Sequence, residues 1–149
     1  MPKPLVGTSL LRKEAHAKVT GRATYVDDVA NAGLLHGATI RTKGPRGRIK
    51  GIRFEGDLPW SEFTIVTAKD IPGKNVVALI NDDQPCLVEE FFNHPEEAVV
   101  LIAHRDKELL ARARAHVILD EEALPSVLTI DEALSKKAVV WGTDNIFKA

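Results

Sequence analysis

The segment AVVLIA at residues 98–103 is the most hydrophobic in the chain, and it decides the fold. A continuous apolar run of this length, bounded by charged residues, is typical of a strand that is buried on both faces. We therefore predict that residues 98–103 form the central strand of a sheet.

The residues that follow predict a helix and then a second strand. Over 105–116 the apolar residues Leu109, Leu110 and Ala113 recur at helical spacing and form one buried stripe. Residues 117–119 read VIL, which predicts another strand. This order of strand, helix and strand resembles a βαβ crossover, which is right-handed if the two strands are parallel.

Upstream of this unit the sequence predicts several further strands. Residues 34–42 and 48–54 flank the turn GPRG at 44–47, so we expect them to form the two arms of a hairpin. Shorter strands, the first two of them buried, are expected at 63–68, 76–80 and 86–88.

Short helices are expected near both ends of the chain. One covers residues 10–19 and stops at Gly21 in a left-handed cap, and the other covers 130–137. Residues 139–145 are expected to run extended. The N-cap candidates are Ser9 for the first helix, and Thr129 or Asp131 for the second.

Together these elements predict an α+β fold with a mixed β-sheet and a few short helices. The chain has 149 residues, of which 44% are hydrophobic and 28% are charged, as in an ordinary globular domain. A chain of this length buries about 70% of its unfolded surface and fits one domain. We expect an extended arm over 1–9, a domain over 10–145, and residues 146–149 outside that domain.

Composition argues against several classes of function. Twenty basic and 21 acidic residues give a net charge of -1, unlike a nucleic-acid-binding or polybasic membrane protein. No apolar run reaches the roughly 20 residues of a membrane helix, and Lys3 is followed by no secretory-signal core. The single cysteine, Cys86, excludes an intrachain disulfide and any cysteine-built zinc or iron–sulfur site. We therefore expect a reducing, cytoplasmic location.

Residue types that carry chemistry elsewhere form no recognisable constellation here. The five histidines are scattered, and His104 and His116 lie too far around the predicted helix to share a metal ion. Neighbouring acidic residues point in different directions, so we expect the acidic pairs to be solvated. Cys86 follows Pro85 and is expected to be a buried structural thiol. We predict no catalytic, cofactor-binding or metal-ligating residue. The acidic pairs are Asp27-Asp28, Asp82-Asp83, Glu89-Glu90, Glu96-Glu97 and Glu121-Glu122.

Residues 41–53 hold six basic side chains and no acidic one. Alternation places most of these charges on one face of the expected hairpin. The stretch lacks the interleaved aromatics typical of nucleic-acid binding, so a solvated face or a contact between subunits is favoured. The basic residues are Arg41, Lys43, Arg46, Arg48, Lys50 and Arg53.

Several segments, taken in order, resemble a known family. They are GTS at 7–9, KVTGRA at 18–23, GLLHGA at 33–38, AKDIPGKN at 68–75, LP at 124–125 and DEAL at 131–134. Together they resemble the start of the large, molybdopterin-binding subunit of the xanthine dehydrogenase/aldehyde oxidase family. The likeness extends from about Gly7 to Asn145, with departures at 42–47 and 93–97.

This resemblance implies the α/β hammerhead domain of a molybdenum hydroxylase. In that family the subunit continues into a molybdopterin-binding domain, to which residues 146–149 would start the link. Iron–sulfur and FAD subunits or domains are the implied electron-transfer partners. The implied parent reaction hydroxylates an aldehyde or N-heterocycle with oxygen from water, and its catalytic glutamate lies in the domain that follows.

The resemblance therefore implies an oxidoreductase domain that is inactive alone, packs on the cofactor domain and shapes the substrate funnel. Leu79, in a loop that approaches the funnel in family members, would line it, and its alternative place is the core. The residues themselves leave a different function open. That alternative is a free-standing α/β binding module that uses the basic hairpin 41–53 to engage an acidic partner.

Overall fold

The computed structural model describes residues 6–77 and 82–146, so Leu79 lies outside the described residues. The chain divides into two compact units, Met1–Leu34 and Leu35–Ala149. The larger unit holds all the strands named below, and the described residues 6–34 of the smaller one hold only short helical turns.

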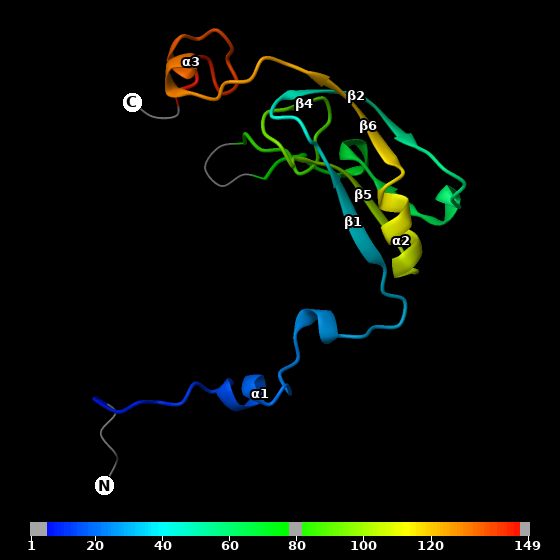
Figure 1. Cartoon of the computed structure of the whole chain (residues 1–149), viewed down its shortest axis with the longest axis vertical. Coiled ribbons are helices and arrows are strands. Elements are labelled where there is room, and N and C mark those ends of the chain that lie inside the picture. The colour runs from blue at the N-terminus through cyan, green and yellow to red at the C-terminus, as the bar shows by residue number, and fades with distance from the viewer. Residues whose placement is uncertain (1–5, 78–81, 147–149) are drawn as a thin grey trace. The chain divides into compact units, whose positions relative to one another are not determined.

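Two three-stranded antiparallel sheets form the larger unit (Figure 1). Their strand orders are β1-β5-β3 and β4-β2-β6. The α+β class with a few short helices is confirmed, and the expected mixed sheet takes the form of these two antiparallel sheets. The strands are β1 His36–Arg41, β2 Gly47–Phe54, β3 Thr64–Val66, β4 Phe91–Phe92, β5 Ala98–His104 and β6 Val117–Ala123.

Strand β5 is the centre of the first sheet, which confirms the prediction made from its apolar run. It pairs with β1 on one side and β3 on the other, so that Ile102 lies opposite both Ala38 and Ile65. Val99, Val100 and Ile102 are completely buried. Leu101 between them is 37% exposed, so one face of the strand is covered only in part, although both of its edges are paired.

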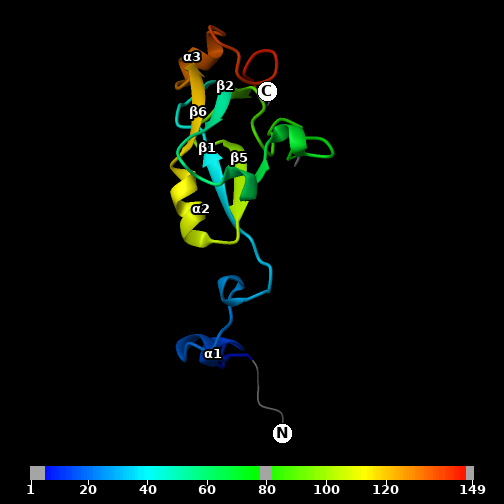
Figure 2. The same cartoon turned by 90° about the vertical axis from the view of Figure 1, so that its right-hand side faces the viewer.

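Helix α2, Lys107–Arg114, follows β5 and lies beside β1 and β5 (Figure 2). It buries Leu110 and Ala113, while Leu109 is half-buried, so the predicted stripe is confirmed. Asp106 caps the helix, since its Oδ1 accepts the backbone N–H groups of Glu108 (2.8 Å) and Leu109 (3.0 Å).

The predicted βαβ crossover is wrong, because β5 and β6 lie in different sheets. After α2 the chain turns at His116, and β6 pairs antiparallel with β2 instead. This register places Leu119 opposite Ile52 and Val117 opposite Phe54. Cross-strand apolar pairs of this kind stabilise a sheet, and they are not visible from the local order of elements.

The predicted hairpin of 34–42 with 48–54 is also wrong, because β1 and β2 belong to different sheets. Thr42 continues along the β5 side: its N–H donates to the Glu97 carbonyl (2.9 Å), and its carbonyl accepts the Glu96 N–H (3.0 Å). Residues 43–46 then cross to the second sheet. The GPRG turn therefore joins two sheets rather than two strands of one sheet.

The remaining strand predictions are only partly confirmed. β3 is an edge strand in which Thr64 is exposed, so the segment 63–68 is not buried on both faces. Residues 86–88 form no strand, although Val88 is buried and its N–H donates to the Ala98 carbonyl (2.7 Å). Of the predicted strand 76–80, residues 78–80 lie outside the described residues, and Val77 forms an isolated bridge with Gln84. Short 3-10 turns occur at η2 Trp60–Glu62 and η3 Ala68–Asp70.

The smaller unit contains α1, Ala15–Val19, and the 3-10 turn η1, Val26–Asp28. The helix begins after Glu14, so the Ser9 cap was wrong, whereas Gly21 is left-handed (φ +70°) as predicted. Leu11 is 91% exposed. Without a buried face to stabilise it, the first part of the predicted helix 10–19 does not form.

The second predicted end helix is α3, Ile130–Leu134, shorter than 130–137. Of the two candidate caps the structure uses Thr129, whose Oγ1 accepts the Glu132 N–H (3.2 Å). Lys136 has a φ of +55°, which ends the helix. The extended run expected at 139–145 is instead a turn, in which the Asn145 Oδ1 accepts the Val140 N–H (2.7 Å).

Candidate docking surfaces

The junction between the two sheets is held by polar side chains that sequence reasoning missed. Thr42 is fully buried, and its Oγ1 accepts the Glu97 N–H (3.0 Å) and donates to the His94 carbonyl (3.3 Å). The Glu97 Oε1 accepts the N–H groups of Asn93 (2.6 Å) and His94 (3.0 Å). Buried polar groups with complete partners of this kind specify one arrangement of the backbone.

Glu121 completes the junction from the second sheet. Its carboxylate accepts the N–H of Lys43 (3.1 Å) and the N–H of Gly44 (3.2 Å), so it ties the crossing segment to β6. Gly47 follows, and a Cβ there would lie 2.5 Å from the Phe92 ring and 2.6 Å from the Glu122 carbonyl oxygen. The crossing therefore requires a glycine at residue 47.

The acidic pairs separate into different environments. Glu97 is buried while Glu96 is exposed, and Glu121 binds backbone while Glu122 pairs with Lys50 (3.3 Å). The expectation that all such pairs are merely solvated is therefore wrong for Glu97 and Glu121, which hold backbone groups. A local signal was available, because a buried turn with unpaired N–H groups needs an acceptor.

The basic stretch 41–53 already has acidic partners within the chain. Arg48 pairs with Glu90 (2.7 Å), and Arg53 pairs with both Glu55 and Asp120. Hydrogen bonds from Arg53 to Glu55, and then to Asp120, raise the pKa of its guanidinium. Because β1 and β2 form no hairpin and three of the six basic residues have acidic partners within the chain, the stretch does not form the basic hairpin face on which the binding-module alternative was based.

The histidines do not come together. His104 packs on Phe63 at 4.7 Å between ring centroids, and its Nδ1 accepts the Asp106 N–H (2.9 Å). His116 follows α2, and a Cβ on Gly56 would lie 2.9 Å from its Nδ1. Across the described ranges no three His, Cys, Asp or Glu side chains gather where they could hold a metal ion.

Cys86 is exposed, so its prediction as a buried thiol is wrong. The cause is local: the Asn75 amide bonds the Leu87 backbone in both directions, with Nδ2 donating to the carbonyl (2.7 Å) and Oδ1 accepting the N–H (3.0 Å). These bonds and the burial of Val88 fix the segment without the thiol. An apolar neighbourhood in sequence did not specify which side chain is buried.

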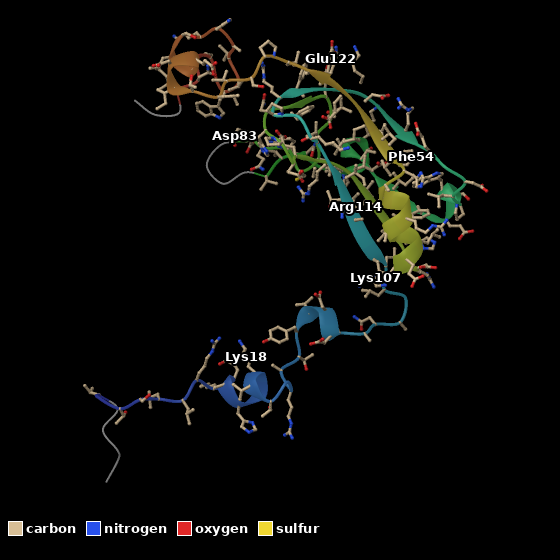
Figure 3. The ribbon with its side chains drawn as sticks, in the orientation of Figure 1. Lys18, Phe54, Asp83, Lys107, Arg114 and Glu122 are labelled. Atoms are coloured by element: carbon tan, nitrogen blue, oxygen red, sulfur yellow. The ribbon has the colours of Figure 1, made fainter. Side chains whose placement is uncertain are left out.

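The loop that follows β3 is fixed at both of its ends. Asp70 accepts the backbone N–H and the hydroxyl of Thr67, both at 2.8 Å, and these bonds lower the pKa of its carboxyl. At the other end the Trp141 Nε1 donates to the Asp83 Oδ2 (2.9 Å; Asp83 is labelled in Figure 3). The described residues on either side of 78–81 are therefore held by side-chain hydrogen bonds.

Two hollows in the larger unit are bounded by open strands. One of about 250 Å³ lies between β1 and β6 and is lined by Ile40, Lys43 and Ile118. The other, of about 440 Å³, lies between β2 and residues 67–69 and has Ile52, Phe54 and Val88 among its lining residues. Both lie beside strands rather than around a cluster of reactive side chains.

Apolar side chains are exposed in two separate segments. None of residues 6–34 is buried, and the segment exposes Val6 (94%), Leu11 (91%) and Val26 (88%). In the larger unit, α3 and the residue two before it expose Leu128, Ile130 and Leu134. Exposed apolar groups in such number mark surfaces that another protein part covers.

A small α+β domain with fixed junctions and uncovered apolar segments is of the class that serves within a larger assembly. Residues 20–125 match the family model described as aldehyde oxidase and xanthine dehydrogenase, a/b hammerhead domain. The chain therefore belongs to this family, as its hammerhead domain, and the expected family is confirmed.

Named relatives and a solved structure agree with this placement. The chain is 30% identical to an indole-3-acetaldehyde oxidase of Arabidopsis thaliana, over 90% of this chain and 11% of that protein. It is 24% identical to the nicotinate dehydrogenase large molybdopterin subunit of Eubacterium barkeri, over 95% of this chain and 34% of that protein. The CO dehydrogenase of Oligotropha carboxidovorans superimposes with a TM-score of 0.77 at 27% identity, over 89% of this chain and 17% of that one.

The chain thus spans between about a tenth and a third of the lengths of these proteins. Its described residues contain no buried side-chain nitrogen or oxygen atom without a hydrogen-bond partner. They also contain no helix long and apolar enough to cross a bilayer.

Proposed function

We propose that this chain is a structural domain of a molybdenum hydroxylase large subunit. It packs on a molybdopterin-binding domain and helps to shape the substrate funnel. The observation that carries the proposal is the contrast between a well-fixed sheet junction and uncovered apolar segments. Thr42, Glu97 and Glu121 leave few internal degrees of freedom, while residues 6–34 bury nothing. Exposed apolar segments beside a rigid core are typical of a domain that packs against a larger protein.

The parent reaction we propose is oxidative hydroxylation of an aldehyde or N-heterocycle, with water as the oxygen source. Relatives named as an aldehyde oxidase and a nicotinate dehydrogenase support this substrate range. Molybdopterin would be held by the neighbouring domain, and iron–sulfur and FAD parts would accept the electrons. This chain would contribute the segment from Val76 to Asp82, including Leu79, to the wall of the funnel.

Thermal unfolding and turnover with the rest of the subunit test the packing role. The chain is titrated with the molybdopterin-loaded remainder of its subunit. In the control titration, a competing hammerhead domain already occupies the surface of the remainder that would bind this chain. We expect the unfolding free energy to rise by about 2.7 kcal/mol when the free partner exceeds its Kd about 100-fold. Turnover of an aldehyde should need both parts. An unchanged melting temperature at saturation would contradict the packing role.

The wall position of Leu79 is tested separately in the assembled enzyme. Leu79→Ala should change KM across a series of substrates of increasing size, because a wall residue discriminates by contact. Leu119→Ala in β6 is the matched control, since it changes the core and not the loop. Equal effects of both variants on every substrate would argue for a core place of Leu79.

A further inference from the structure

Strand β2 has a partner along its whole length on one side only. β6 pairs with it from Gly47 to Phe54, whereas β4 pairs only with Gly47 and Arg48 on the other side. The bond from the Ile49 N–H to the Glu90 carbonyl (2.7 Å) is the last backbone bond on that side within the described ranges. Beyond residue 49 this edge of β2 is open to a further strand.

Strand alternation fixes which backbone groups face the open side. Glu55 donates its N–H to the His116 carbonyl (2.9 Å), on the side of β6. Successive residues of an antiparallel strand direct their N–H and C=O groups to opposite sides. The backbone N–H and C=O groups of Arg53 therefore face β6, while those of Ile52 and Phe54 face the open side.

The 440 Å³ hollow described above, which we call the β2 groove, runs along this open edge. The apolar part of its lining, which we call its floor, comes from Ile49, Ile52, Phe54 and Val88; Phe54 is labelled in Figure 3. Two lysines and one carboxylate line it as well, namely Lys50, Lys69 and Glu89. Lys69 forms no ion pair with the described residues, and the Lys50 pair with Glu122 is exposed and so weak.

We propose that the β2 groove binds an extended acidic segment of a partner protein, which adds a strand to β2. Backbone groups of Ile52 and Phe54 would pair with the segment, apolar side chains of the segment would meet the floor, and its carboxylates would meet Lys69 and Lys50. Main-chain pairing supplies affinity in this mode of recognition, and the side-chain contacts supply specificity. The proposal stands apart from the proposed function, because it needs no cofactor domain.

A short fluorescent peptide of alternating glutamate and valine, added to the full chain, tests the proposal. Amide exchange followed by NMR should slow about tenfold or more at Ile52 and Phe54 and stay unchanged at Arg53. Fluorescence anisotropy should show about fivefold weaker binding to Lys69→Glu. Lys107→Glu is the matched control: Lys107, labelled in Figure 3, does not line the groove and should leave the affinity unchanged.

Two altered peptides separate strand addition from simple charge attraction. A peptide with methylated backbone nitrogens should lose binding, and a peptide of alternating lysine and valine should not bind. Equal binding of the methylated peptide would overturn the proposal, as would protection at Arg53 instead of Ile52. Sedimentation of the chain alone tests whether a second copy of the chain occupies the groove instead. A dimer that dissociates in the Lys69→Glu variant would place a second copy there and would also overturn the proposal.

Discussion

At the scale of single residues, the sheet junction depends on groups whose removal leaves buried partners unpaired. The Thr42 side chain is fully buried, and its hydroxyl bonds both the Glu97 N–H and the His94 carbonyl. Valine at this position has nearly the same shape but cannot make either bond. Leaving a buried donor without a partner costs more than the bond itself contributes.

We therefore expect Thr42→Val to lower the free energy of unfolding by about 1–3 kcal/mol. Thr64→Val, on the exposed edge strand β3, is the control and should change it by less than about 0.5 kcal/mol. Urea unfolding followed by fluorescence measures both. Equal small effects of the two variants would mean that the junction is not held by this hydroxyl.

A second residue-scale prediction concerns Gly47, whose missing side chain admits the Phe92 ring. Gly47→Ala places a carbon where ring and backbone atoms already lie, so we expect a loss of about 1–3 kcal/mol of unfolding free energy. Gly37→Ala is the control, because its Cβ would meet only a Leu101 methyl at 3.7 Å. Thermal unfolding distinguishes them, and matched melting temperatures would contradict the close packing at residue 47.

At the scale of elements, the local sequence pattern predicted the secondary structure of a segment more accurately than its pairing partner. The apolar run of β5 and the stripe of α2 were predictable, because each reflects burial of its own residues. The partners of β1 and β6 were not, because they depend on Glu97 and Glu121, which lie far along the chain from Thr42 and Lys43. The same distance hid the candidate site, since the open edge of β2 follows from the two-residue length of β4.

The N-cap of helix α2, Asp106, leads to a prediction about how stability depends on pH. Backbone bonds from Leu109 and Glu108 lower the pKa of the Asp106 carboxyl in the folded chain. The folded state thus binds fewer protons than the unfolded state, so Asp106 stabilises the fold above its ordinary pKa and loses this effect as the pH falls through the lowered one. The wild-type melting temperature should therefore fall below about pH 5.

Asp106→Asn keeps a capping oxygen but does not titrate, so its melting temperature should fall less steeply over the same acid range. Asp57→Asn serves as the control, because Asp57 is exposed and makes no hydrogen bond or ion pair with the described residues. Melting curves recorded from neutral to acid pH provide the comparison. Parallel curves for wild type and Asp106→Asn would show that the cap does not contribute through its charge.

At the scale of the whole molecule, some hydrophobic residues of the chain form a buried core, and others lie exposed outside that core. β5 and its neighbours bury Val99, Val100 and Ile102, while residues 6–34 bury none of their side chains. Composition alone could not reveal this division, since both segments contribute to the same 44% of hydrophobic residues. Under the proposed function, this uncovered segment is the one that the cofactor domain covers.

Limited proteolysis tests this division directly. Backbone in a segment without buried side chains opens at little cost in free energy, so trypsin should reach it first. We expect cleavage after Lys13, Lys18 and Arg22 to precede cleavage in β2, which pairs with β6 along its length, and in helix α2. Mass spectrometry of timed samples identifies the order.

Adding the molybdopterin-loaded remainder of the subunit should then slow cleavage between residues 13 and 22 and leave the rate at Arg105 nearly unchanged. Arg105 is the internal control, because it is exposed and lies in the turn between β5 and α2 rather than in the uncovered apolar segment. Equal slowing at both places would indicate general inhibition of the protease. Early cleavage within β2 or α2 would contradict the assignment of the stable core, because those elements could be cut only after the sheets had opened.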